Sequence, residues 1–328
     1  MPPPEKGTRK PRIAVIGGGT GLSVMLRGLK MKPVDITAIV TVADDGGSSG
    51  RLREEMHIPP PGDIRNVLAA LADTESLLNQ MLSYRFQNGT GLAGHSLGNL
   101  ILAALTDITG DFVTAVKELS KVLAIRGRVL PAAGQAIVLG AEMADGTVVL
   151  GESNIPKAGG QIRRVFIEPK NVEPLPDAVQ AIREADCILI GPGSLYTSIM
   201  PNLIVPKLAE AIVASRALKI FVCNIMTQPG ETDDYSVSHH LDAIEAHIGH
   251  HIFDYVIVNS GEIPPEVQLR YAEQGARPVR LDLAEVTRRG SRVIADHLVQ
   301  YQTYLRHDAA KLSDHIYRLV EAWLLRKE

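Results

Sequence analysis

A glycine-rich turn between a buried strand and a helix constrains this chain more than any other feature. Residues 13–16 (Ile-Ala-Val-Ile) form a short apolar run, typical of a strand buried on both faces of a parallel sheet. Five residues with little side-chain bulk follow at 17–21 (Gly-Gly-Gly-Thr-Gly), and apolar residues then recur at helical spacing through Leu29. This order places free backbone N–H groups at the positive end of a helix dipole, which favours binding of an anion, most often phosphate. The alternative is a tight turn that binds nothing, although four glycines exceed what a turn needs.

The glycine turn matches neither of the two common phosphate motifs. A P-loop requires a lysine after its last glycine, and none follows here. The dinucleotide fingerprint Gly-x-Gly-x-x-Gly fails at its third glycine, because that position is Leu22. The turn therefore predicts a phosphate site without specifying the ligand, and its candidate residues are Gly18, Gly19, Thr20 and Gly21.

Composition excludes several classes of protein. Of the 328 residues 45% are hydrophobic, which is enough for a sizeable core. A net charge of −3 and only 4% aromatic residues argue against nucleic acid as a partner. No apolar run reaches the roughly 18 residues of a membrane span, and residues 1–11 lack the apolar region of a signal peptide. We therefore expect a disordered tail over 1–11 and a single α/β domain over 12–328. Cys187 and Cys223 lie in apolar runs, which predicts buried, reduced thiols in a cytoplasmic protein.

Acidic residues follow the second predicted strand, residues 36–42. Asp44 and Asp45 lie at its carboxyl end, where a Rossmann-like fold would hold a ribose. The same carboxylates could hold a divalent metal ion, because Mg²⁺ prefers one or two carboxylates plus phosphate oxygens. Residues 46–50 add a second N–H-rich loop, and the candidate ligands in and after it are Ser48, Ser49 and Arg51. A solvated turn is the alternative, since Asp-Gly pairs are ordinary turn formers.

A further helix is predicted after the proline-rich turn at 59–62. Asp63 is expected to be its N-cap, with Arg65 and Asn66 in the first turn. An arginine at that end opposes the helix dipole unless an anion lies there. The pattern therefore favours Asp63, Arg65 and Asn66 as site residues, with simple capping as the alternative.

A glycine pair with a histidine precedes the apolar segment that begins at residue 100. Gly94 and Gly98 are four residues apart and would share one face of a helix, with His95 and Asn99 on the neighbouring face. The glycines would allow close approach of a ligand, so His95 and Asn99 are candidate ligand residues. A satisfied core histidine is the alternative.

The second half of the chain repeats the opening pattern. Residues 127–168 predict a small β-rich elaboration with a turn at Asp145-Gly146. A buried strand, a glycine- and hydroxyl-rich loop at 191–198 and a helix then follow, and the same physics predicts a second phosphate loop. Its candidate residues are Gly191, Gly193, Ser194 and Thr197. Two later predicted strands end in Asn224 and Asn259, which could bond a base or a sugar.

Together these motifs resemble the YvcK/CofD-like family. The resemblance rests on Gly17–Gly21, Ala43–Arg51, Gly62–Asn66, Gly94–Asn99 and Gly191–Ser198, and it spans nearly the whole chain. It is closer to the YvcK branch of gluconeogenesis factors than to CofD, the 2-phospho-L-lactate transferase. It implies a three-layer Rossmann-like sandwich with a mostly parallel sheet.

The resemblance also implies a nucleotide-sugar-binding regulatory protein. YvcK-like proteins bind UDP-sugars such as UDP-N-acetylglucosamine and are linked to gluconeogenic growth, cell-wall precursor supply and cell shape, with no established reaction. By motif, family ligand residues map onto Tyr271 and Arg306, and carboxylates around a divalent ion map onto Asp45 and Asp63. We expect Mg²⁺ and no tightly bound organic cofactor, a regulatory protein partner, and assembly of identical chains. The enzyme alternative is a Mg²⁺-dependent transferase of a nucleotide-linked phosphate group, and Leu22 disfavours a nicotinamide-dependent oxidoreductase.

Overall fold

The central sheet of the computed structural model has seven strands, all parallel to their neighbours. The structure describes residues 9–73, 76–301 and 304–326. The strand order is β10-β9-β8-β7-β1-β2-β3. Their bounds are β1 (Arg12–Gly17), β2 (Asp35–Val40), β3 (Arg128–Pro131), β7 (Cys187–Ile190), β8 (Leu218–Val222), β9 (Tyr255–Asn259) and β10 (Arg292–Asp296).

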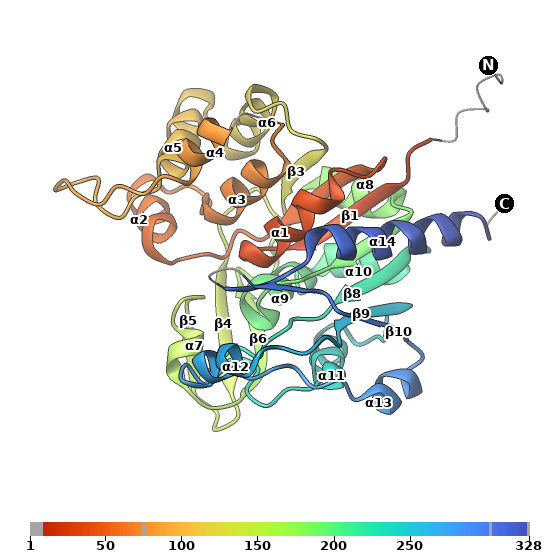
Figure 1. Ribbon diagram of the computed structural model, residues 1–328. Helices are drawn as coiled ribbons and strands as arrows, with labels where there is room; N and C mark the ends of the chain where they lie inside the picture. Colours follow the sequence, from red (N-terminus) through yellow and green to blue (C-terminus); the bar gives the residue numbers. More distant parts are fainter. Residues whose placement is uncertain (1–8, 74–75, 302–303, 327–328) are drawn as a thin grey trace, which may run out of the picture.

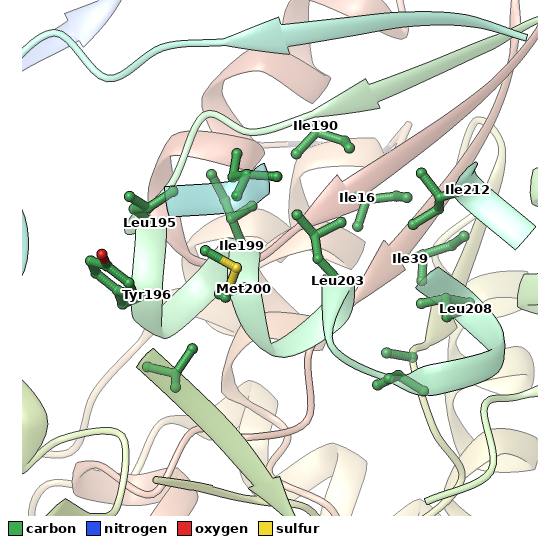
Figure 2. Packing of buried hydrophobic residues seen from close by; sticks show 14 of the residues in the cluster. Ile16, Ile39, Ile190, Leu195, Tyr196, Ile199, Met200, Leu203, Leu208 and Ile212 are labelled. Carbon is green, nitrogen blue, oxygen red and sulfur yellow. The ribbon is translucent and has the colours of Figure 1, made fainter. Parts of the chain in front are cut away.

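Alternation along β1 shows why the chain forms two cores. Ile13 and Val15 pack on one face of the sheet, whereas Ala14 and Ile16 pack on the other. The first face is covered by α1 (Gly19–Leu29), α3 (Gly62–Leu71), α5 (Leu97–Thr109), α6 (Phe112–Val122) and α14 (Ala309–Leu324). The second face is covered by α8 (Pro176–Glu184), the π-helix η1 (Leu195–Ile199), α9 (Met200–Leu203), α10 (Pro206–Ala214) and α11 (Val237–Ile248). Figure 2 shows η1, α9 and α10 packed on Ile16, Ile39 and Ile190. The predicted three-layer α/β fold is confirmed.

The strand order reverses beside β1. The chain passes from β1 to β2 and β3 on one side of the sheet, and from β7 to β8, β9 and β10 on the other. The loops after β1 and β7 lead into helices on opposite faces of the sheet, α1 and η1. Such a reversal opens a crevice at the carboxyl edge of a parallel sheet, and ligands bind there in open α/β folds.

A second, antiparallel sheet of three strands packs below the main one (Figure 1). It consists of β4 (Val138–Met143), β5 (Val148–Leu150) and β6 (Ile162–Glu168). The predicted turn at Asp145-Gly146 joins β4 to β5, and the Asp145 carboxylate accepts the Thr147 N–H at 2.9 Å. The elaboration predicted over 127–168 begins later than expected, because β3 pairs with β2 in the main sheet.

Smaller elements complete the molecule in Figure 1. They are α2 (Gly47–Met56), α4 (Ser76–Ser83), α7 (Ile155–Ala158), α12 (Pro265–Ala272), α13 (Leu283–Arg288), β11 (Val299–Tyr301) and β12 (Leu305–His307). Within the described ranges, no single helix is long and apolar enough to cross a membrane, and only α5 with α6, bent by 119°, passes that test as a pair. Cys187 and Cys223 are buried and free, as predicted.

The segment before β1 is anchored from Arg9 onward. The Arg9 guanidinium donates to both carboxylate oxygens of Asp186, at 2.6 and 2.8 Å. The Pro11 carbonyl accepts the Asp35 N–H at 2.8 Å. The prediction of a disordered tail over 1–11 is therefore wrong for residues 9–11, and residues 1–8 lie outside the described part of the chain.

Candidate functional site

The crevice at the reversal point contains a cavity of about 400 Å³. The loops after β1, β7 and β8 form one side of it, and α12 and β12 form the other. Eight of the predicted site residues line it: Gly19, Thr20, Gly21, Gly193, Ser194, Asn224, Tyr271 and Arg306. Residues separated by almost 290 positions thus meet at one edge of the sheet, since Gly19 and Arg306 share this cavity.

Neighbouring residues come so close to the first glycine-rich turn, residues 17–21, that two of its glycines leave little room for a side chain. A Cβ on Gly18 would lie 2.5 Å from an Asp63 carboxylate oxygen, and one on Gly21 would lie 3.2 Å from the Pro192 carbonyl. Gly19 adopts a φ of +70°, which side chains rarely tolerate. Part of the glycine content is therefore explained by contact with the neighbouring loop and with α3, while Gly19, Thr20 and Gly21 at the start of α1 line the cavity.

Tyr271 and Arg306 form the far wall of the cavity. The Tyr271 hydroxyl accepts the Leu305 N–H at 3.0 Å, which ties β12 to α12. Arg306 is exposed beside it. His307, which sequence reasoning missed, is buried and donates from Nε2 to the Cys223 carbonyl at 3.2 Å. Burial lowers the pKa of His307 to about 4, so this histidine is neutral at pH 7 and anchors the strand that carries Arg306.

Several polar groups of the second glycine loop, residues 191–198, already form hydrogen bonds within the protein. Glu231 accepts from the Thr197 hydroxyl at 3.0 Å and from the Tyr196 N–H at 3.2 Å. Burial raises the pKa of Glu231 to about 6, and these hydrogen bonds oppose the rise. Asn224 both donates to and accepts from the Gly193 backbone, at 2.8 and 3.2 Å. A carboxylate therefore already occupies donors at the start of η1 that we predicted for phosphate.

Gly191 and Thr197 lie outside the lining of the cavity. Gly191 has a φ of +77° and turns the chain out of β7. The lining instead includes Ser198 and Gln228, which were not among the predicted residues, and the Gln228 amide donates to the Ser194 hydroxyl. Ser198 ends the recognised motif at 191–198, whereas Gln228 carries no sequence signal.

Asp63 does not cap its own helix. α3 begins at Gly62 with Pro61 in the N-cap position, and no side chain makes a capping bond there. The buried Asp63 carboxylate instead accepts the backbone N–H of Gly19, across the sheet edge. Burial, followed by repulsion from Asp44, raises the pKa of Asp63 to about 7. The N-cap prediction is wrong because the β1–α1 turn offers this carboxylate a donor from another part of the chain.

Asp63 belongs to an acidic cluster that we define as Asp44, Asp45, Asp63 and Glu152. Burial and repulsion from the three aspartates raise the pKa of Glu152 to about 8. Asp45 accepts the Ser153 N–H at 2.8 Å, and Asp44 accepts the Gly46 N–H at 2.9 Å. Glu152 follows no recognised motif and was missed. Among the described residues, no three His, Cys, Asp or Glu side chains converge closely enough to hold a metal ion by themselves.

Ser48, His95 and Asn99 form a separate buried network. The Ser48 hydroxyl oxygen accepts from the Ser96 N–H at 3.3 Å and from the Asn99 amide at 3.2 Å. Because two donors occupy this oxygen, its hydrogen points to Nδ1 of His95, 3.1 Å away. α5 begins at Leu97, so His95 precedes the helix and does not share a helical face with Asn99 as predicted. The two residues meet through Ser48 instead.

The remaining predicted residues face other partners. Arg65 donates to the Ser96 hydroxyl at 3.1 Å and to the Asn66 side chain at 2.8 Å. Their role at an anion site stays a prediction. Arg51 donates to the Ala93 carbonyl at 2.8 Å. Ser49 is buried against Gly62. Asn259 bonds Gly261 and Leu298 and lies outside the cavity lining.

Comparisons with known proteins agree with this architecture. The family described as 2-phospho-L-lactate transferase CofD matches residues 13–299. A gluconeogenesis factor from Bacillus subtilis is 58% identical over 306 residues, covering 93% of this chain and 96% of that protein. A second gluconeogenesis factor, from Halalkalibacterium halodurans, is 56% identical over 309 residues, covering 94% of this chain and 96% of that protein. A crystal structure of a Bacillus halodurans protein superposes with a TM-score of 0.92 at 56% identity, covering 94% of this chain and 99% of that one. The chain therefore belongs to the CofD family, together with these gluconeogenesis factors.

Proposed function

We propose that the cavity at the carboxyl edge binds a UDP-sugar, with UDP-N-acetylglucosamine as the leading candidate. The observation that carries the proposal is the meeting of the glycine loop, Tyr271 and Arg306 in one cavity of about 400 Å³. N–H groups at the start of α1 suit a diphosphate, and a guanidinium binds phosphate oxygens in a bidentate way. A tyrosine ring offers an apolar face and a polar tip to a base or sugar.

The same proposal gives the protein a regulatory role in the cytoplasm. It would report the supply of a cell-wall precursor to central carbon metabolism through a protein partner, without consuming the nucleotide. The name gluconeogenesis factor, carried by the relatives, supports the link to carbon metabolism.

Substitution of Arg306 tests the binding site. A charged hydrogen bond contributes about 1.5–3 kcal/mol, so Arg306→Ala should weaken UDP-sugar binding about 10- to 100-fold by calorimetry. Arg306→Lys should recover only part of this loss, because the charge returns without the planar fork. Arg183→Ala, on the exposed side of α8, is the matched control and should bind normally. An Arg306→Ala protein that melts normally and binds within twofold of the parent would remove the far wall of the cavity from the proposed site.

Incubation with UDP-N-acetylglucosamine tests the regulatory role. We expect the nucleotide to be recovered intact by chromatography after long incubation with the protein and Mg²⁺. Steady release of UDP or UMP would overturn the regulatory proposal and support an enzyme.

A Mg²⁺-dependent transferase is the second candidate, and the acidic cluster favours it. Two carboxylates with phosphate oxygens and water suit Mg²⁺, and a cation would relieve the repulsion that raises the pKa values of Asp63 and Glu152. Asp45 and Asp63 remain the predicted pair, and Asp44 is the carboxylate that acts most strongly on Asp63. When bound, the ion would stabilise negative charge on a transferred phosphate group.

A further inference from the structure

A second and larger cavity, of about 640 Å³, lies at the opposite edge of the main sheet. Its lining includes the first residues of β1, β2 and β3, which are Arg12, Asp35 and Arg128, and the segment that follows α1. β1 has six residues, so its two ends lie roughly 17 Å apart at about 3.3 Å per residue. The amino-edge cavity is therefore separate from the cavity that contains Arg306.

The amino-edge cavity is strongly cationic in a chain whose net charge is −3. Among the described residues, its lining contains only two acidic ones, Asp35 and Glu184. The cationic residues are Lys10, Arg12, Lys30, Lys32, Arg126 and Arg128. This excess concentrates positive potential in a concave surface, which attracts anions.

Half of these cations already have carboxylate partners. Arg12 pairs with Glu184 at 3.1 Å, Arg126 pairs with Asp73 at 2.9 Å, and Lys32 pairs with Asp314. Lys10, Lys30 and Arg128 form no ion pair within 4.0 Å with any carboxylate in the described part of the chain. Three cations of the cavity therefore have no ion pair. The Asp35 carboxylate of the same lining also has none in the described part of the chain and offsets one of these charges, which leaves a net excess of two.

Two of the three cations without an ion pair are held in place by neutral partners. Nε and Nη2 of Arg128 both donate to the Thr37 hydroxyl, at 3.2 and 3.0 Å, which fixes the plane of the guanidinium. The half-buried Lys30 ammonium donates to the Ala72 carbonyl at 2.7 Å. Burial lowers the pKa of Lys30. The negative charge of Asp73 raises this pKa in part, and the positive charge of Arg126 lowers it further. A bound anion would offset this cost, because its negative charge favours the charged form of Lys30.

We propose that the amino-edge cavity binds a small phosphorylated carbohydrate that carries at least two negative charges. Arginine and lysine together suit phosphate oxygens, and a net excess of two positive charges suits a dianion. The partly exposed Val34 offers an apolar contact to a short carbon skeleton, whereas the side chains of Ile13 and Ala14 are buried on opposite faces of the sheet. None of the described residues that line the cavity is aromatic, so it offers no stacking surface for a nucleobase. The concave shape and the volume of about 640 Å³ favour a small molecule over an extended polymer.

Calorimetry on the full chain tests this proposal, with inorganic pyrophosphate and a hexose 1,6-bisphosphate as probes. We expect both to bind, and we expect Lys30→Gln and Arg128→Gln each to weaken binding at least tenfold. Arg128→Lys should recover part of the loss. Lys207→Gln, which removes an exposed lysine paired with Glu173 elsewhere, is the charge-matched control and should bind normally.

Arg306→Ala separates the two cavities, because it alters only the carboxyl edge. Binding of the bisphosphate that survives Arg306→Ala and is lost in Arg128→Gln supports the proposal, and the reverse pattern overturns it. Lys10→Gln changes an exposed side chain and replaces Lys30→Gln if that variant does not fold. The proposal is overturned if neither probe binds. It is also overturned if an RNA oligomer binds through the same cations and the bisphosphate does not.

Discussion

Replacing Asp63 with asparagine should stabilise the protein at alkaline pH and remove a response to Mg²⁺. The carboxyl group of Asp63 is buried, and its pKa rises from the ordinary value of 3.8 to about 7, first because of burial and then because of Asp44. The bond from the Gly19 N–H opposes this rise, and an asparagine oxygen can still accept that bond. The substitution therefore removes the charge and keeps the acceptor.

The direction of the pH effect follows from the proton balance. Between about pH 4 and pH 7 the folded protein keeps a proton on Asp63 that the unfolded chain has lost. The stability associated with this group is thus fully present below pH 4 and is lost as the pH rises through 7. At about 1.4 kcal/mol per pH unit, the ionised carboxylate costs up to about 4 kcal/mol at pH 8. In a chain of this length about 1 kcal/mol changes Tm by about 1.5 °C, so Asp63→Asn should melt up to about 6 °C higher at pH 8.

Thermal melts at pH 4 and pH 8, with Mg²⁺ or with EDTA, measure both effects. At pH 4 the variant and the parent should melt together, because Asp63 is then protonated. At pH 8 Mg²⁺ should raise the Tm of the parent and leave that of Asp63→Asn almost unchanged. Asp107→Asn, on the exposed side of α5, is the control and should show no such pH dependence. A variant that melts below the parent at pH 8 would refute the reasoning, since the buried charge would then be stabilising.

Two further substitutions test the contact between α1 and α14 and the hydrogen bonds at the start of η1. Gly28→Ala would place a Cβ 2.1 Å from the Ala309 carbonyl of α14. The overpacking should cost about 1–3 kcal/mol and outweigh the gain of about 1 kcal/mol in helix propensity, so calorimetry should show a lower Tm. In the control Gly91→Ala the new Cβ meets open space, and this variant should melt as the parent does. Equal Tm values for the two variants would contradict this packing. Glu231→Gln presents an amide N–H to one of the donors at the start of η1, so urea unfolding at pH 5 should show a loss of about 1–3 kcal/mol. This loss should narrow at pH 8, because the raised pKa of Glu231 means that its ionised form stabilises the parent less than its protonated form does. Glu210→Gln on the exposed side of α10 is the control, and unchanged stability of Glu231→Gln would show that the carboxylate is not needed there.

Local patterns in the sequence were sufficient for much of the fold. β7 ends directly before the loop at 191–198 and β9 ends at Asn259, as predicted, because a short run of apolar residues is typical of a strand buried inside a sheet. The turn at Asp145-Gly146 follows from a glycine that accepts a φ of +88°. The glycine loops after β1 and β7 were also visible locally, since few residues allow so close an approach of two backbones.

The partners of charged side chains were decided only by the tertiary structure. The sequence around Asp63 has the pattern of a helix cap, yet the carboxylate bonds Gly19 because the β1–α1 turn lies beside α3. Glu152 and Glu231 follow no motif, and they matter because strand order brings their loops to the same edge of the sheet. Hydrophobic periodicity is a local property of the chain, whereas burial and charge repulsion depend on which segments become neighbours. The sequence therefore determined the layers and loops of this protein, and only the folded chain decided which carboxylates and cations face one another.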